Sequence, residues 1–188
     1  MIKSEIRSKL KLIRNNLHKT CDKQICAKNL INNLAPLLNE NINVVAGYYP
    51  KADEFDLIPV LEYLRNRNIK VCLPYIPPNS LVMQFKQWNL EDQLIPGAFG
   101  ILEPCESSQT LIPDLVLAPL LAVDKKGNRI GYGRGHYDAT IRAMRKNYQV
   151  LLFGVCYDGQ IIKNAPSEPD DEALDYIVTE KELYICQK

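Results

Sequence analysis

The chain has 188 residues, a length that favours one domain, and we expect residues 1–188 to form a single unit. Apolar residues make up 46% and charged residues 24% of the chain, as in ordinary globular proteins. Lys and Arg total 23 against 22 Asp and Glu. This near balance argues against a protein that coats nucleic acid or an anionic membrane through bulk charge.

The chain start, MIKSEIRSKLKLIRNNL, lacks the apolar stretch of a signal peptide, and no apolar run is long enough for a transmembrane helix. We therefore expect a cytoplasmic protein with neither a nucleic-acid nor a membrane partner. The six cysteines form no C-x-x-C pair and fit no zinc spacing, so we expect reduced thiols that mostly pack in the interior.

The first third of the chain alternates helical and extended patterns. Ile6, Leu10, Ile13 and Leu17 recur at helical spacing and predict an amphipathic helix over residues 3–18. A second helix is expected from near residue 20 to 34. A short β-rich run at 43–49 follows, and then a helix at 54–68, in whose first turn Pro59 is tolerated.

The remaining two thirds are richer in strands. We expect strands at 69–76 and 81–88, a turn-rich surface excursion at 91–113, and a helix at 136–147. The near-continuous apolar runs 114–123 and 149–157 predict strands buried on both faces, and short strands are expected at 176–180 and 183–186. Helices that alternate with apolar strands predict an α/β, three-layer, Rossmann-like fold with a mostly parallel central sheet.

The segment LAVDKKGNRIGYGRGHYD (residues 121–138) leaves a predicted strand and enters a predicted helix, where ligands of α/β sheets bind. Gly131, Gly133 and Gly135 allow backbone amides to approach an oxyanion, and the helix that follows adds N–H donors and a favourable dipole. The pattern is neither a Walker A loop nor a G-x-G-x-x-G fingerprint. A flexible glycine-rich turn remains the alternative interpretation.

Several charged residues have both a structural and a functional interpretation. Asp138 is either a favourable first-turn carboxylate or a magnesium ligand beside a nucleotide phosphate. Lys3 and Arg7 share one helix face, which is either a solvated basic face or a ligand contact. Helix capping or substrate contact explains the acids that follow strand 43–49, namely Asp53, Glu54 and Asp56.

The two histidines differ in setting. His18 lies in a polar stretch of helix and is expected at the surface, whereas His136 lies in the glycine loop and is a candidate ligand contact. No serine–histidine or cysteine–histidine pairing stands out, so nucleophilic hydrolysis has little support.

Residues 124–138, DKKGNRIGYGRGHYD, resemble the signature of the 5-formyltetrahydrofolate cyclo-ligase (methenyltetrahydrofolate synthetase) family, approximately F-D-x-x-G-x-R-L-G-x-G-x-G-Y-Y-D. The resemblance continues over nearly the whole chain in order and spacing. Its further elements are K-x-x-x-R at Lys3–Arg7, the strand and acidic turn at 47–61, G-I-x-E-P at 100–104, D-L-V-L-x-P at 114–119 and the late acidic element at 166–180.

The resemblance implies an enzyme that uses ATP and magnesium to convert 5-formyltetrahydrofolate into 5,10-methenyltetrahydrofolate, releasing ADP and phosphate. It also implies that the formyl oxygen is phosphorylated first, after which nitrogen 10 attacks the activated carbon. Such a protein must mainly position two ligands and neutralise phosphoryl charge. We expect a reduced folate as the small-molecule partner, and a monomer.

The same resemblance assigns roles to positions of this chain. Arg134 is the expected catalytic cation, and Asp138 and Asp175 are the expected magnesium ligands. The residues expected to bind ATP are Lys3, Arg7, Arg129, Ile130, Gly131, Tyr132, Gly133, Arg134, Gly135, His136 and Tyr137. Those expected to bind the folate are Tyr49, Glu54, Tyr132, Gly133, Arg134, Gly135 and His136.

The chain departs from the family pattern at four positions, which are Leu120, Val123, His136 and Asp170. These departures leave open a nucleotide-dependent ligase or phosphotransferase that acts on a different formylated or carboxylated substrate on the same scaffold. A non-catalytic nucleotide- or anion-binding module is a further alternative. The retained carboxylates Glu54, Asp138 and Asp175 disfavour it, because anion binding alone has no need of them.

Overall fold

The computed structural model describes the backbone of residues 3–187 and side chains from Glu5 onward. Its helices are α1 (Lys3–Thr20), α2 (Lys23–Leu34), η1 (Ala35–Leu37), α3 (Ile58–Asn66), η2 (Ala98–Gly100), α4 (His136–Arg145) and η3 (Asp158–Gln160). The strands of its main sheet are β1 (Val44–Ala46), β2 (Lys70–Tyr75), β3 (Gln84–Gln87), β6 (Thr110–Leu111), β7 (Leu115–Pro119), β10 (Leu151–Val155), β11 (Tyr176–Val178) and β12 (Leu183–Ile185). Two small hairpins pair β4 (Ile95–Pro96) with β5 (Leu102–Glu103) and β8 (Ala122–Val123) with β9 (Arg129–Ile130).

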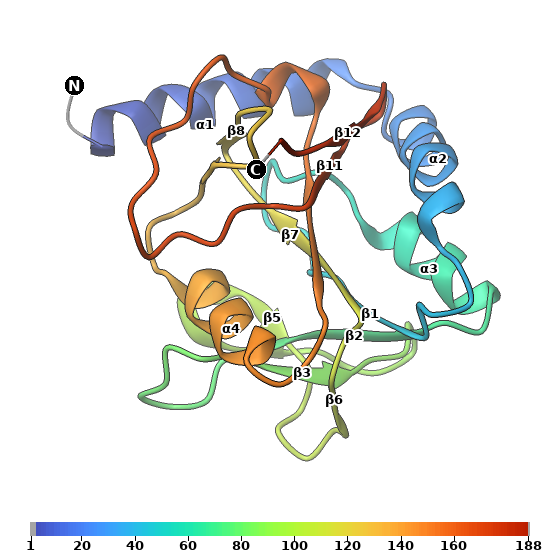
Figure 1. The fold of residues 1–188 in the computed structure, drawn as a ribbon. Helices are drawn as coiled ribbons and strands as arrows, with labels where there is room; N and C mark the ends of the chain where they lie inside the picture. The colour runs from blue at the N-terminus through green and yellow to red at the C-terminus, as the bar shows by residue number, and fades with distance from the viewer. Residues whose placement is uncertain (1–2, 188) are drawn as a thin grey trace.

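The main sheet has the order β12-β11-β10-β7-β1-β2-β3-β6 (Figure 1). The five strands from β11 to β2 are parallel. At one edge β12 runs antiparallel to β11, and at the other β3 runs antiparallel to β2 and β6 antiparallel to β3. The strand order reverses between β1 and β7. In open α/β sheets the crevice at such a switch point, outside the carboxyl ends of the strands, is where ligands bind.

Helices cover both faces of the sheet, as predicted from the alternating pattern. Leu115 and Leu117 of β7 pack in one cluster with residues of α2 and α3, and Val116 and Ala118 pack in the other with Ile141 of α4. Successive strand residues point to opposite faces, so an apolar run of this kind is buried on both. The three-layer, mostly parallel α/β prediction is confirmed.

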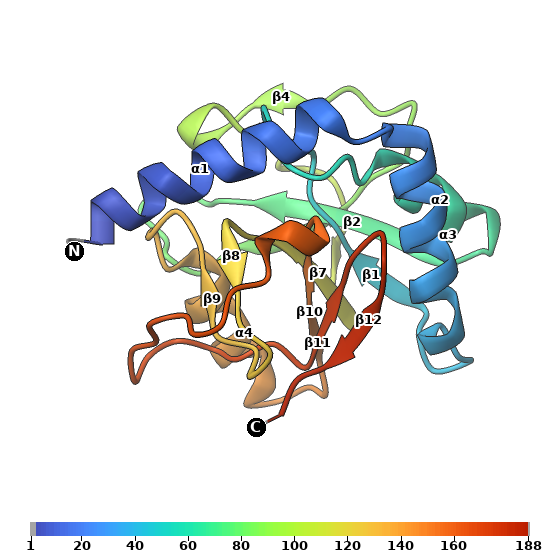
Figure 2. The ribbon, with the colours of Figure 1, turned by 90° about the horizontal axis from the view of Figure 1, so that it is seen from above.

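Helix α1 belongs to neither layer but crosses the edge of the sheet at the carboxyl ends of the parallel strands (Figures 1 and 2). Its inward face differs from the predicted one. Ile13 is 45% exposed, whereas Arg14 is 1% exposed and occupies the buried position beside Leu10. The prediction that Ile13 belongs to the apolar face is therefore wrong, because a buried arginine takes its place.

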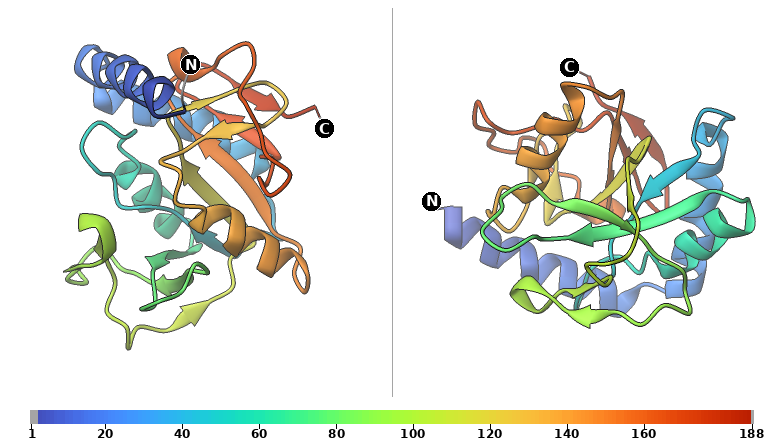
Figure 3. Two further views of the ribbon diagram at one scale, coloured as in Figure 1. Left: turned by 90° about the vertical axis from the view of Figure 1, so that its left-hand side faces the viewer. Right: turned by 90° about the horizontal axis from the view of Figure 1, so that it is seen from below.

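The expected strand 114–123 is broken in two. β7 ends at Pro119, and Leu121 donates its N–H to the carbonyl of Ile130, which starts the β8–β9 hairpin that leads into the glycine loop. The excursion at 91–113 is also more ordered than predicted, since it holds the β4–β5 hairpin and ends in β6, which joins the main sheet beside β3. Figure 3 shows this excursion along one side of the molecule.

The structure also bears on the expectations about the cysteines and about membrane-spanning helices. Cys21 and Cys26 lie next to each other at the turn between α1 and α2, with 6.8 Å between their Cα atoms, whereas Cys72, Cys156 and Cys186 are buried thiols, as expected of packing cysteines. Over the residues that the structure describes, no helix is both long and apolar enough to cross a bilayer.

Candidate functional site

A cavity of about 1280 Å³ opens at the switch point of the sheet. Helix α1 forms one wall and the turn after β1 a second, while the glycine loop, the η2 excursion and the late segment near Pro166 complete it. The volume exceeds the roughly 300–1000 Å³ usual for the site of one small molecule. The cavity therefore has room for two ligands side by side.

The glycine loop presents unbonded backbone donors to this cavity. Within the described chain, no N–H from Gly131 to Gly135 donates a hydrogen bond to another residue. Gly133 and Gly135 have φ values of +82° and +75°, a region that favours glycine, and Gly135 is the N-cap of α4. A run of free N–H groups at a helix N-terminus is suited to an oxyanion such as phosphate.

Arg7 ties this loop to α1. Its Nε donates to the carbonyl of Gly131 at 3.0 Å. A Cβ built on Gly133 would lie 2.7 Å from the Arg7 guanidinium, so a larger residue there would require the Arg7 side chain to shift. Figure 2 shows the hairpin and the loop beside the amino-terminal half of α1. The predicted phosphate-binding residues of α1 and of the loop are thus brought together through Arg7.

Arg134 is exposed at the tip of the loop, where its guanidinium carbon lies 4.3 Å from the centre of the Phe99 ring. Phe99 itself has a φ of +58° and stands on η2, and the ring of His136 lies 5.8 Å from it. His136 is held by a 2.9 Å hydrogen bond between Nδ1 and the carbonyl of Leu81. The structure therefore places a cation and two rings at the glycine loop.

Glu54 lies on the opposite wall, in the turn after β1. Its side chain is nearly buried, and it accepts a 2.9 Å hydrogen bond from the N–H of Lys51. Burial raises the pKa of the Glu54 carboxyl, although Lys51 N–H and the charge of Arg14 oppose the shift. Tyr49 lines the same wall and packs edge-on to Trp88 with 6.4 Å between ring centres. A buried carboxyl beside aromatic rings suits a flat, nitrogen-rich ring ligand.

Asp138 lies at the cavity edge, in the first turn of α4. Its Oδ1 accepts from Arg129 at 2.6 Å and from the N–H of Glu172 at 3.0 Å. Its Oδ2 accepts no hydrogen bond from any described residue. Magnesium commonly takes one or two carboxylates together with phosphate oxygens, so a single carboxylate oxygen beside the glycine loop fits that ion.

Asp175, the second predicted magnesium ligand, does not line the cavity. It precedes β11, at the amino-terminal edge of the sheet. Its Oδ2 accepts from Arg145 at 2.7 Å and from the N–H of Leu152 at 2.8 Å. Because the cavity lies at the opposite, carboxyl-terminal edge, the structure does not bring Asp175 to Asp138. The side chain of Lys3, a predicted ATP contact, lies outside the described residues.

The remaining predicted residues all reach the cavity, although their side chains differ in what they do there. Arg129 is engaged with Asp138 and with the carbonyl of Glu172, so it supports the loop. Tyr137 packs against the α4 side of the core, and burial raises the pKa of its hydroxyl. The predicted residues that line the cavity are Arg7, Tyr49, Glu54, Arg129, Ile130, Gly131, Tyr132, Gly133, Arg134, Gly135, His136, Tyr137 and Asp138.

The structure adds cavity residues that sequence reasoning missed. Arg14 and Lys11 reach it from α1, and the signal was present, because both fall on the face that carries Arg7. Glu103 is 3% exposed and accepts from the N–H groups of Ile76 and Ala98. It lies within the G-I-x-E-P element, and burial raises the pKa of its carboxyl.

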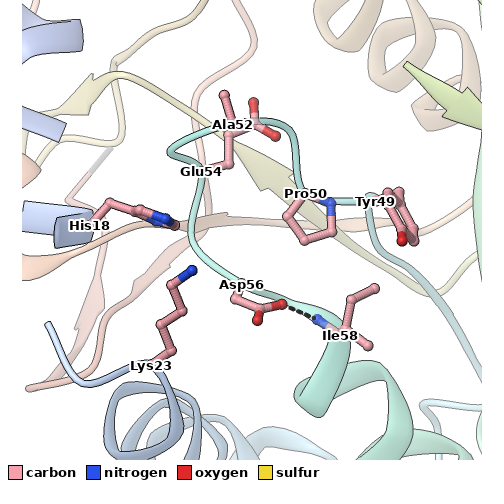
Figure 4. Close-up of a pocket in the computed structure, with 8 residues that line it drawn as sticks. All are labelled: His18, Lys23, Tyr49, Pro50, Ala52, Glu54, Asp56 and Ile58. Atoms are coloured by element: carbon pink, nitrogen blue, oxygen red, sulfur yellow. Dashed lines mark hydrogen bonds between the residues drawn. The ribbon is translucent and has the colours of Figure 1, made fainter. Parts of the chain in front are cut away.

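A smaller pocket of about 270 Å³ adjoins the cavity beyond the acidic turn (Figure 4). His18 and Lys23 extend from one side toward the turn that carries Glu54 and Asp56. His18 is partly exposed, in keeping with the surface position expected, and its Nδ1 lies 3.2 Å from the hydroxyl of Tyr157. Asp56 accepts from the N–H of Ile58 at 3.2 Å, which matches the capping interpretation of this acid.

Comparison with known proteins gives consistent matches over most of the chain. Residues 1–180 match the model of the 5-formyltetrahydrofolate cyclo-ligase family. The 5-formyltetrahydrofolate cyclo-ligase of Haemophilus influenzae is 30% identical over 179 residues, which cover 92% of this chain and 94% of that protein. The Escherichia coli K12 protein of the same name is 28% identical over 147 residues, covering 76% of this chain and 80% of that protein.

Solved structures agree with the sequence matches. The Aquifex aeolicus 5,10-methenyltetrahydrofolate synthetase shares 29% identity, with a TM-score of 0.81 and coverage of 100% of this chain and 94% of that chain. The Mycoplasma pneumoniae synthetase, at 19% identity and a TM-score of 0.71, covers 96% of this chain and supports the fold alone. The family match spans the glycine loop, the acidic turn and the G-I-x-E-P element that meet in the cavity, and the chain therefore belongs to the 5-formyltetrahydrofolate cyclo-ligase family.

Proposed function

We propose that this protein converts 5-formyltetrahydrofolate into 5,10-methenyltetrahydrofolate with hydrolysis of ATP to ADP and phosphate. The observation that carries the proposal is that one cavity of about 1280 Å³ holds both the glycine loop and the acidic turn around Glu54. A loop of free N–H groups suits a triphosphate, and a buried carboxyl among aromatic rings suits a pterin. Family membership supports the same activity.

The reaction divides into two displacements. The formyl oxygen attacks the γ-phosphorus of ATP and displaces ADP, which turns a poor leaving group into a good one. Nitrogen 10 then attacks the formyl carbon, loses its proton, and phosphate leaves with the electrons of the carbon–oxygen bond. No oxidant or reductant is needed, so the protein must mainly position the substrates and stabilise phosphoryl charge.

Specific residues of this chain fit those tasks. The N–H groups of Gly131–Gly135 would hold phosphate oxygens, with Arg7 fixing the loop against α1. Arg134 would move from its place over Phe99 to the transferring phosphoryl group, where a cation stabilises the charge. Glu54 and Tyr49 would hold the pterin end of the folate on the opposite wall.

Magnesium is part of the proposal, with Asp138 as its protein ligand. The Oδ2 atom of Asp138 would bind the ion next to the phosphates, while Arg129 orients the carboxylate through Oδ1. The ion would neutralise phosphate charge during transfer. Asp175 is left out of this site, because its carboxylate is engaged with Arg145 at the far edge of the sheet.

An absorbance assay for methenyltetrahydrofolate tests the proposal. We expect product only when the protein, 5-formyltetrahydrofolate, ATP and magnesium are all present. A folded protein that yields no ATP-dependent product from active folate would overturn it. A thermal-shift screen of other formylated or carboxylated compounds then tests the alternative substrate class, since a true substrate stabilises the fold.

The location and the oligomeric state of the enzyme are also part of the proposal. We propose that the enzyme acts in the cytoplasm, because ATP and reduced folates are available there, and that it acts as a monomer through a single domain. Light scattering after gel filtration checks the monomer, and a mass near twice the chain mass of 21.4 kDa would contradict it.

A further inference from the structure

Arg14 is the most deeply buried charged residue of the cavity wall. We propose that Arg14 is a positioning residue of the cyclo-ligase reaction, which fixes Tyr132 of the glycine loop and the acidic turn at Asp53–Glu54 relative to each other. The inference rests on the proposed function, because the loop is the ATP side of the cavity and the turn is the folate side. Arg14 would set the distance between the two substrates.

The contacts of Arg14 reach three parts of the chain outside α1. Its Nη2 donates to Oδ1 of Asp53 at 2.7 Å and also to the hydroxyl of Tyr132. Its Nη1 donates to the carbonyl of Leu120 at 3.2 Å and lies 3.8 Å from Oε1 of Glu54. One planar guanidinium therefore joins α1, the acidic turn, the end of β7 and the glycine loop. A lysine has one nitrogen and cannot hold these directions together.

The charge of this group is matched to its partners. The Arg14 side chain is 1% exposed, and a buried cation is tolerated only when paired. Burial alone would lower the pKa of Arg14, but the hydrogen bonds to Asp53 and Tyr132 outweigh it and raise the pKa. Burial would likewise raise the pKa of Asp53, but the bond from Arg14 outweighs it and lowers the pKa. The pair stays charged at the cavity wall.

A second observation separates this role from simple stabilisation. The Nε of Arg14 is buried and has no hydrogen-bond partner among the described residues, although Arg14 lines the cavity. Leaving a buried donor unsatisfied costs about 1–3 kcal/mol, and an apolar side chain of similar size would avoid that cost. An arginine at this place is thus a poor choice for stability alone and a suitable one for a ligand-binding wall.

Tyr132 makes the arrangement particular to this chain. The family signature leaves this position open, as the first variable residue of G-x-G-x-G. Here the tyrosine is 44% exposed, its hydroxyl meets Arg14, and the amine of Lys11 lies 5.1 Å from its ring centre. The Tyr132 side chain thus connects the glycine loop to α1. Removal of its hydroxyl should leave the Arg14–Asp53 ion pair in place.

Kinetics of Arg14→Lys, Tyr132→Phe and the double variant test the proposal. Misplaced substrates react more slowly even when each still binds, so Arg14→Lys should lower kcat about 10- to 100-fold with KM for ATP and folate nearly unchanged. Tyr132→Phe should lower kcat in the same sense. The double variant should be no slower than Arg14→Lys alone, because both changes break one connection. Arg65→Lys and Tyr148→Phe, which lie outside the cavity, are the matched controls.

Each outcome decides the question. Unchanged kcat in Arg14→Lys would overturn the proposal. It would also be overturned if the fold-loss of kcat in the double variant equalled the product of the losses in the two single variants. The folded fraction of each variant is measured by circular dichroism at the assay temperature. If kcat falls only in proportion to that fraction, Arg14 has a structural role and the positioning role is overturned. The wild type is assayed first. An inactive wild type contradicts the proposed function, whereas an active wild type with indifferent variants contradicts only the role of Arg14.

Discussion

Arg134, the proposed catalytic cation, makes few contacts that could serve the fold. Its side chain is exposed, it forms no ion pair with an acid among the described residues, and it rests on the ring of Phe99. A cation held only by an exposed ring is free to move at little cost, since such contacts contribute about 0.5–1 kcal/mol. Substitution should therefore affect turnover and leave stability unchanged.

We predict that Arg134→Ala lowers kcat by about 10²- to 10³-fold, the usual loss when one donor to transition-state charge is removed. Folate affinity, measured by fluorescence titration, should change far less. Lys126→Ala is the matched control, because Lys126 is exposed in the β8–β9 turn and does not line the cavity. Full turnover in Arg134→Ala would remove the catalytic role of this residue.

At the same scale, the sequence predicted some site residues and missed others for identifiable reasons. The glycine loop and Glu54 were predictable, because backbone freedom and an acid after a strand are visible in the residues themselves. Arg14 was missed although it shares a helix face with Arg7, since the helical period of apolar residues assigned the inward position to Ile13. Asp175 was misplaced, because a late acidic motif does not reveal at which edge of the sheet it ends.

Strand β10 shows how tightly the central elements are packed. Gly154 is the fourth of its five residues, paired with Ala118 of β7 on one side and Ile177 of β11 on the other. A Cβ at this position would lie 2.5 Å from Leu174 and 2.8 Å from Leu120. Leu120 stands at one of the departures from the family pattern, so the substituted leucine helps to fill the space that this glycine leaves.

We predict that Gly154→Ala lowers the free energy of unfolding by about 1–3 kcal/mol, the usual cost of overpacking a core. The melting temperature should fall by about 2–4 °C for each kcal/mol in a chain of this size. Gly131→Ala is the control for stability, because a Cβ there meets no atom within 4 Å. Equal melting temperatures for Gly154→Ala and the wild type would contradict the prediction. They would show that the side chains of Leu174 and Leu120 shift to make room for the added Cβ.

Elements with long, regular patterns were predicted best. The helix at Pro59 was predicted, but it spans Ile58–Asn66 and not 54–68, because proline fits only the first turn. The strands buried on both faces follow from local chemistry. The β8–β9 hairpin was missed, because β8 lies inside the apolar run 114–123, which reads as one strand, and β9 has only two residues. The break after Pro119 depends on a hydrogen bond between Leu121 and Ile130, a contact that only the folded chain supplies.

For the molecule as a whole, the sheet topology brings distant segments to one edge. The loops after β1, β2 and β7 all begin at the carboxyl-terminal edge of the sheet, and α1 lies across that edge. A closed set of hydrogen bonds holds the glycine loop's hairpin in this frame. Asp124, 2% exposed, accepts from Lys126 N–H, from both nitrogens of Asn128 and from Ala165 N–H, each at 3.0 Å.

The charge state of Asp124 should make stability depend on acid. Burial alone would raise the pKa of this carboxyl, but the bonds from Ala165 and Asn128 outweigh it and lower the pKa. A carboxyl whose pKa is lower in the folded than in the unfolded chain stabilises the fold above its unfolded value, about 3.9. That stabilisation is lost as the pH falls through the lower, folded value.

We predict that Asp124→Asn lowers the free energy of unfolding at pH 7 by about 1–3 kcal/mol. The NH₂ group of asparagine would replace a carboxylate oxygen and would face N–H groups that now donate to that oxygen. The difference from the wild type should shrink in urea unfolding measured below about pH 4, where the wild-type carboxyl takes up its proton. Asp170→Asn is the control, because Asp170 is 92% exposed and its pair with Arg142 contributes little. A difference that stays constant from pH 7 to pH 3 would show that the Asp124 charge does not stabilise the hairpin.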